Sequence, residues 1–141
     1  MTTVCYKNGV MASDSGAYGG DILSGYVKKI CKTTYKGEEA VAGFSGALWS
    51  RDQFLGADNP EIKSNESEGF IVCKSQPLIA HHFNEGGSIA IDFSHIGCYA
   101  IGGGQELAIG MMRAGMSATE AIRAVSEIHT HTKGPIQEER L

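Results

Sequence analysis

The sequence predicts an α+β protein in which two antiparallel sheets pack face to face and helices cover the outside. Short strand-like segments separated by turn signals fill residues 3–46 and 70–101, whereas helical periodicity is confined mostly to the last third. Strands and helices in separate runs favour α+β over an alternating α/β fold. Glycine, at 19 of 141 residues with only 3 prolines, exceeds its usual share of about 7% and indicates tight hairpins rather than a linker.

Two-residue turn signals divide the first third into a strand meander. Asn8-Gly9, between two alternating segments, is the strongest short hairpin signal in the chain. The expected strands cover residues 3–7, 10–13, 26–35 and 40–44, with turns at Asn8-Gly9, Gly19-Gly20 and Lys36-Gly37.

The middle of the chain predicts a helix, a loop and three further strands. The helix is expected at 47–55, and the polar, turn-rich stretch 56–69 is expected to be a surface loop. The strands are expected at 70–74, 78–83 and 89–101, the last of them interrupted near Ser94.

Two helices are expected in the last third. Residues 105–114 carry apolar side chains on one face. Ser117 and Glu120 form a capping box, in which the serine oxygen and the glutamate carboxylate each accept from a backbone amide at the start of a second helix. That helix should stop by Gly134-Pro135.

Length and composition indicate one globular domain. Residues 1–141, with 42% hydrophobic and 20% charged residues, are expected to form a single domain. No stretch of about 18 apolar residues predicts a membrane span, and the N-terminus lacks a signal-peptide pattern, so we expect a cytoplasmic location. A net charge of −4 without a basic tract argues against nucleic acid and membranes as partners.

Cysteine and histidine spacing does not suggest a metal site. The four cysteines contain no CxxC pair and are expected to be buried thiols. His129 and His131, two residues apart near a helix end, should point in different directions. We therefore expect no metal and no cofactor.

Thr2 is the first candidate catalytic residue. If Met1 is removed, this one residue carries a hydroxyl nucleophile and a free α-amine. Because such an amine titrates at about 7.7–8.0, it can act as a general base at neutral pH.

Asp14 and one of two adjacent lysines are candidates for tuning Thr2. Asp14 ends the second strand of a hairpin whose first strand begins at Thr2. Alternation sends Lys28 and Lys29 to opposite faces, so only one of them can approach Thr2. A nearby lysine lowers the pKa of a hydroxyl and of an amine, and a carboxylate can hold that lysine in place.

Five segments share their order and spacing with a known family. They are Thr2-Thr3-Val4, Ala12-Ser13-Asp14-Ser15, Tyr26-Val27-Lys28-Lys29-Ile30, Ala42-Gly43-Phe44-Ser45-Gly46 and Tyr99-Ala100-Ile101-Gly102-Gly103-Gly104. Over about residues 2–134 the chain resembles the proteasome β-subunits, most closely the shorter HslV-type peptidases, which belong to the N-terminal nucleophile hydrolases. The resemblance implies a four-layer α/β/β/α sandwich of two antiparallel sheets.

The resemblance also implies roles for individual residues. Thr2 would be the nucleophile, Lys29 the activating cation and Asp14 the acid that positions the lysine. The backbone amide of Gly46 would stabilise the oxyanion. Phe44 would line the pocket for the substrate residue before the cut and give a preference for apolar side chains.

The chain departs from the family in its supporting residues. Relatives usually carry Gly-Ser-Gly where this chain has Gly102-Gly103-Gly104, so Gly103 lacks a hydroxyl. At the end of the second late helix, Thr130 lies near the place of an aspartate and Lys133 near that of a serine. The chain also ends early, without the last strands and closing helix of longer members.

The implied function is that of a threonine peptidase that works through an acyl-enzyme in a closed ring of identical subunits. Peptides or unfolded proteins would be its substrates, and an ATP-dependent unfoldase is a possible partner. Two alternatives remain open, namely a catalytically degenerate ring-forming protein and a hydrolase of small-molecule amides with the same fold.

Overall fold

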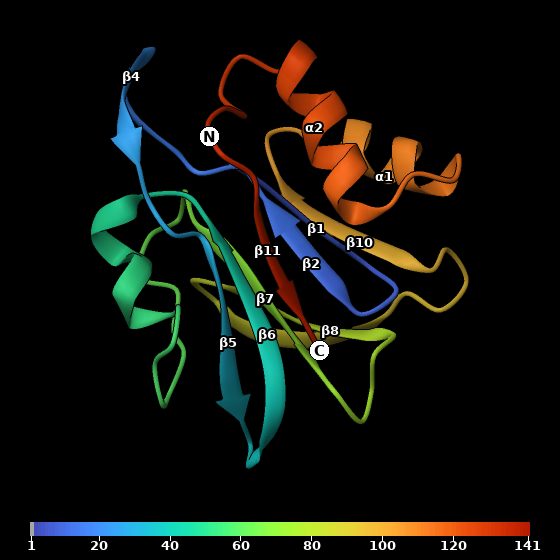
Figure 1. Cartoon of the computed structure of the whole chain (residues 1–141). Helices are drawn as coiled ribbons and strands as arrows, with labels where there is room; N and C mark the ends of the chain where they lie inside the picture. The colour runs from blue at the N-terminus through green and yellow to red at the C-terminus, as the bar shows by residue number, and fades with distance from the viewer. Residues whose placement is uncertain (1) are drawn as a thin grey trace.

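The computed structural model describes residues 2–141, which form two main antiparallel sheets and one separate hairpin (Figure 1). The first sheet has the strand order β10-β1-β2-β11 and the second the order β5-β6-β7-β8-β9. The first sheet comprises β1 (Thr3–Lys7), β2 (Val10–Ser13), β10 (Cys98–Gly102) and β11 (Gln137–Arg140). The second comprises β5 (Ile30–Tyr35), β6 (Glu38–Ser45), β7 (Glu68–Cys73), β8 (Ile79–Asn84) and β9 (Gly87–Asp92). The hairpin pairs β3 (Gly16–Gly19) with β4 (Ile22–Tyr26).

Three apolar clusters hold these elements together in layers. The first lies between the two sheets, where Val4 and Met11 of the first sheet meet Val41 and Phe70 of the second. A second cluster joins the first sheet to α1 (Gln105–Arg113) and α2 (Ala118–Ile128), which lie over its outer face (Figure 1). Full burial of each Val, Ile or Phe side chain contributes about 1.5–3 kcal/mol.

The outer face of the second sheet is covered without an α-helix. Residues 47–55 were expected to be a helix, but only the 3₁₀-helix η1 (Leu48–Gln53) forms there. Phe54, directly after η1, and Ile62, in the loop that follows, pack on this face in the third apolar cluster. The predicted α+β sandwich of antiparallel sheets is therefore confirmed, and both α-helices lie on one side of it.

The turn chemistry agrees with the sequence. Asn8 and Gly9 adopt positive φ angles of 52° and 79°, which suit the hairpin turn between β1 and β2. The predicted capping box is present at the start of α2, where Ser117 accepts from Glu120 N and Glu120 accepts from Ser117 N.

Some strands differ from the prediction. The single strand expected at 26–35 is split, because β4 ends at Tyr26 and β5 begins at Ile30. The strand β11, which pairs with β2, was not expected. The last helix stops at Ile128, before Gly134-Pro135 as predicted, since His129 takes an extended conformation. Within residues 2–141, no helix has both the length and the apolar character needed to cross a membrane.

Candidate active site

Thr2 lies directly before β1, a central strand of the first sheet. Thr2 is 4% exposed, and its carbonyl oxygen accepts a hydrogen bond from Gly103 N at 2.9 Å. The register of β1 with β10 sets Thr3 opposite Gly102 and thereby brings the glycine run to the chain start. Met1, whose removal the expected mechanism requires, lies outside the described residues.

Asp14 and Lys29 form a buried ion pair that contacts the backbone of Thr3, the residue after Thr2. Lys29 Nζ lies 3.0 Å from Asp14 Oδ2, and each side chain is 1% exposed. Asp14 Oδ1 accepts from Thr3 N at 3.1 Å, and Oδ2 also accepts from Lys133 N at 3.3 Å. Burial lowers the pKa of Lys29 and raises that of Asp14, while the attraction between the two charges opposes both changes.

Gln137 fixes the irregular segment that carries Lys29. Its side-chain oxygen accepts from Lys29 N at 2.9 Å, and its side-chain nitrogen donates to Val27 O at 2.7 Å. Lys28 is exposed, so the two lysines point to opposite sides as predicted, although neither lies in a strand. The sequence did not single out Gln137, because an isolated glutamine in a polar tail has no distinguishing pattern.

The segment after α2 reaches the site through Thr132, which was not expected, and through the backbone of Lys133, which was. Thr132 Oγ1 lies 2.8 Å from Thr3 Oγ1 and 2.7 Å from His129 Nδ1. Thr130, by contrast, is exposed. Lys133 approaches Asp14 through its backbone amide, whereas its ammonium group donates to Ser126 O at the end of α2.

A pocket of about 300 Å³ opens beside Thr2. It is lined by Thr2, Gly16, Tyr18, Gly46, Ala47, Leu48 and Trp49. Gly46 has a φ of 136°, and a Cβ built there would lie 2.4 Å from Ser67 Oγ, so only glycine fits. Leu48 and Trp49, on η1, supply the large apolar surface of this pocket.

Phe44, expected to line a substrate pocket, lies in the apolar cluster behind this site. Its residue is 1% exposed, and its ring centroid is 6.3 Å from that of Phe54. It is not among the residues that line the pocket beside Thr2.

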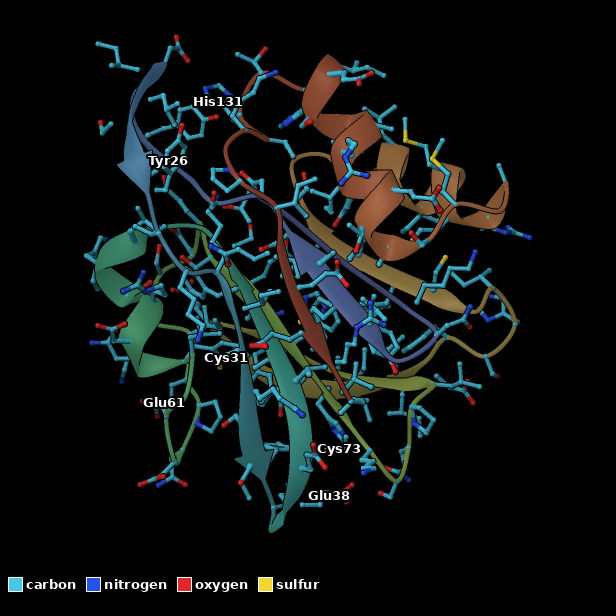
Figure 2. All side chains as sticks on the ribbon, viewed as in Figure 1. Tyr26, Cys31, Glu38, Glu61, Cys73 and His131 are labelled. Carbon is cyan, nitrogen blue, oxygen red and sulfur yellow. The ribbon has the colours of Figure 1, made fainter. Side chains whose placement is uncertain are left out.

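The cysteines lie in the apolar clusters, away from this polar arrangement. Cys5, Cys31, Cys73 and Cys98 are all free and buried, as predicted. Burial raises the pKa of each thiol. In the part of the chain that the structure describes, no group of three or more His, Cys, Asp or Glu side chains is placed to hold a metal ion. Figure 2 shows two of these cysteines, Cys31 and Cys73, on the second sheet, whereas His131 lies beyond α2.

Gly102→Ala is expected to disrupt this site. Gly102 has a φ of 96°, and a Cβ built there would lie 1.8 Å from Thr2 O, so the start of β1 must move. We expect a loss of stability greater than the cost of the left-handed backbone alone, which is about 1–2 kcal/mol. The free energy of unfolding, determined in urea, measures this loss of stability.

Gly20→Ala is the matched control for this substitution. Gly20 also has a positive φ, of 61°, but nothing lies within 4 Å of the built Cβ. An equal loss of stability in the two variants would contradict a close contact between Gly102 and Thr2.

Solved structures of other proteins resemble this chain in fold. The sequence matches no family model, and a search of curated proteins finds no match either. Among solved structures, BPH from Thiobacillus denitrificans in complex with epoxomicin is similar, with 19% identity, a TM-score of 0.66 and coverage of 99% of this chain and 97% of that chain.

Two further structures have the same fold. HslV from Trypanosoma brucei is 14% identical with a TM-score of 0.66, and the match covers 99% of this chain and 98% of that one. The Anbu complex from Pseudomonas aeruginosa, a helical assembly, is 12% identical with a TM-score of 0.67, covering 100% of this chain and 81% of that chain. The fold is thus that of the proteasome- and HslV-like subunits, as the sequence resemblance predicted.

Proposed function

We propose that this chain is an N-terminal threonine peptidase. The observation that carries the proposal is the position of Thr2, which is held beside the buried Asp14–Lys29 pair and lines a pocket. After removal of Met1, Thr2 Oγ attacks a peptide carbonyl carbon while the Thr2 α-amine takes the hydroxyl proton. The amine then passes this proton to the leaving amine as the peptide C–N bond breaks. Water hydrolyses the resulting ester and regenerates the threonine.

Lys29, Asp14 and Gly46 have supporting roles in this proposal. The Lys29 cation lowers the pKa of the Thr2 hydroxyl and of its amine, and Asp14 holds the lysine in place. The backbone N–H of Gly46, which lines the same pocket as Thr2, stabilises the oxyanion of the tetrahedral intermediate. Such a donor typically contributes about 2.7–4 kcal/mol to the lowering of the barrier.

The substrate would be a peptide with an apolar side chain before the cut. This preference was predicted from Phe44, but we assign it to Leu48 and Trp49, because these side chains line the pocket beside Thr2. Trp49 is 70% exposed and is free to contact a bound chain.

We further propose that the chain is one domain that assembles with copies of itself. Large exposed apolar side chains outside the pocket, including Ile22 and Ile89, support an interface, as does the similarity to an assembled Anbu complex. A ring fed by an ATP-dependent unfoldase is the arrangement expected from the family resemblance. In the four-layer description of this fold, η1 and the loop after it would stand for the second helical layer.

A catalytically degenerate assembly protein is the second candidate. The observation that favours it is the absence of a side chain at Gly103, whose amide contacts Thr2 O where relatives carry a serine. The two candidates differ in whether the purified protein starts at Thr2 and whether it reacts there.

Reaction with epoxomicin, the compound bound by the Thiobacillus neighbour, tests the peptidase proposal directly. We expect the intact mass to correspond to a chain starting at Thr2 and to increase by one inhibitor molecule per subunit. Peptide mapping should locate the added mass at Thr2. Mass spectrometry of the intact and digested protein measures both.

Thr2→Ala is the control and should gain no mass. A purified chain that still begins with Met1 has no free amine at Thr2, and this result would contradict the peptidase and support the assembly protein.

A further inference from the structure

A row of polar side chains next to Thr2 ends at a histidine that the proposed reaction does not use. His129 Nδ1 lies 2.7 Å from Thr132 Oγ1, which lies 2.8 Å from Thr3 Oγ1. Thr3 Oγ1 in turn accepts a hydrogen bond from Gly104 N at 3.1 Å. Thr3 and Thr132 are both 0% exposed, so neither hydroxyl can turn toward solvent.

Only one direction of hydrogen bonds satisfies both hydroxyls. Because Thr3 Oγ1 accepts from Gly104, its own proton needs an acceptor, and among residues 2–141 that acceptor is Thr132 Oγ1. The Thr132 proton must then go to His129 Nδ1. This direction requires a neutral ring with an unprotonated Nδ1 and its proton on Nε2.

Protonation of His129 disfavours this row. A protonated Nδ1 is a donor, so Thr132 would have to accept from it and turn its own proton toward Thr3 Oγ1. Thr3 Oγ1 would still accept from Gly104 N and Thr132 Oγ1, but its own proton would have no acceptor among the described residues. A buried donor without an acceptor costs free energy, so the row is weakened.

We propose that His129 is a positioning residue whose neutral ring ends this row and thereby holds Thr3, and with it Thr2, at the pocket. The link is direct, since Thr3 follows Thr2 and its amide donates to Asp14 Oδ1 at 3.1 Å. Acidification that protonates His129 releases the row and loosens the start of β1. The consequence for hydrolysis rests on the proposed function, whereas the consequence for stability does not.

Burial and the charged groups around His129 together favour its neutral form. Burial is the largest cause that lowers the pKa of His129, the cationic forms of His131 and Lys133 add to it, and Asp14 opposes it. The ring of His131 lies with its centroid 6.3 Å away.

The sign of the pH dependence follows from this lowered pKa. A group whose pKa is lower in the folded state than in the unfolded chain binds fewer protons when folded, so stability rises with pH. The stabilisation by neutral His129 is complete above the ordinary histidine pKa of about 6.5. It is lost as the pH falls from there through the lower pKa of the folded state.

Urea unfolding between pH 8 and pH 5 tests the proposal with three variants. Asn Oδ1 can accept where Nδ1 does but does not titrate, so His129→Asn should show a smaller fall of the unfolding midpoint below pH 6.5 than the wild type. His129→Leu has no acceptor and should have a low midpoint at every pH. His95→Asn is the matched control, because His95 is exposed between β9 and β10 and lies outside the row, and it should keep the wild-type pH dependence.

Imidazole nitrogen NMR on the wild-type protein is the second measurement and needs no variant. We expect His129 to be neutral with its proton on Nε2 and to titrate below pH 6.5. A proton on Nδ1, or the same pH dependence of unfolding in wild type and His129→Asn, overturns the proposal.

Peptide hydrolysis separates this proposal from the proposed function. In the wild type, both the Thr2 amine and His129 must lose a proton for activity, so at pH values below both pKa values kcat/KM should rise about a hundredfold per pH unit. In His129→Asn only the amine must lose a proton, so kcat/KM should rise about tenfold per pH unit. If neither protein hydrolyses peptides at any pH, the peptidase proposal fails, and unfolding and NMR still decide the role of His129.

Discussion

Thr2→Ala is expected to abolish hydrolysis of a small apolar peptide amide, with a loss of at least about 10³-fold in kcat. The substitution removes the attacking oxygen and leaves the α-amine, the Asp14–Lys29 pair and the pocket in place. Because no other hydroxyl takes over the attack, the residual rate comes only from binding and oxyanion stabilisation. Release of a fluorescent leaving amine, measured on protein whose N-terminus has been sequenced, gives the rate.

Two variants make this result specific. Thr2→Ser keeps a hydroxyl on the same residue and should retain measurable activity. Thr34→Ala removes a hydroxyl from an exposed position of β5 and should be as active as the wild type. Hydrolysis that survives Thr2→Ala would exclude Thr2 as the nucleophile.

Breaking the Asp14–Lys29 pair is expected to have the largest effect on stability. Lys29→Met leaves the Asp14 carboxylate buried without its cation, and Asp14→Asn leaves the Lys29 ammonium buried without its anion. Removing one partner of a buried pair typically costs about 3–5 kcal/mol in the free energy of unfolding. The double variant removes both charges, so it should be more stable than the sum of the two single losses predicts.

The exposed pair of Lys74 and Glu39 is the matched control for the buried one. Its atoms are 3.3 Å apart, but the two side chains are 65% and 42% exposed. Lys74→Met should therefore cost no more than about 1 kcal/mol. If Lys29→Met costs no more than Lys74→Met in urea unfolding, the buried pair is not a major determinant of stability. All three variants of the buried pair should also be inactive if Lys29 activates Thr2.

The strand meander and the last helices could be predicted because their signals are local. Asn8-Gly9 determines a hairpin wherever it occurs between alternating segments, and the capping box at Ser117 starts a helix through contacts within four residues. The strand β11 has no such signal. Its sequence Gln-Glu-Glu-Arg is polar throughout, and it is a strand because β2 offers it an edge.

Part of the candidate site could be predicted, because some of its residues lie in segments with a recognisable spacing. Thr2, Asp14 and Lys29 fall in segments whose spacing carries the family resemblance, and the structure brings Asp14 and Lys29 together beside the start of β1. Thr132 and His129 could not be chosen from the stretch His129-Thr130-His131-Thr132. Which of these alternating residues points inward depends on where α2 ends, and the sequence predicted only that this helix stops by Gly134-Pro135.

The first sheet combines the earliest and the latest parts of the chain, so it is complete only when synthesis is nearly finished. β1 and β2 are complete by Ser13, yet β10 does not begin until Cys98 and β11 not until Gln137. At about 5–20 residues per second, a ribosome takes on the order of ten seconds to make the chain between β2 and β10. During that interval Thr2 lacks its contact with Gly103 and Thr3 lacks its contact with Thr132, so the start of the nascent chain is accessible to an aminopeptidase. If Met1 is removed as the proposed function requires, the order of the strands leaves time for this removal before the finished fold buries Thr2.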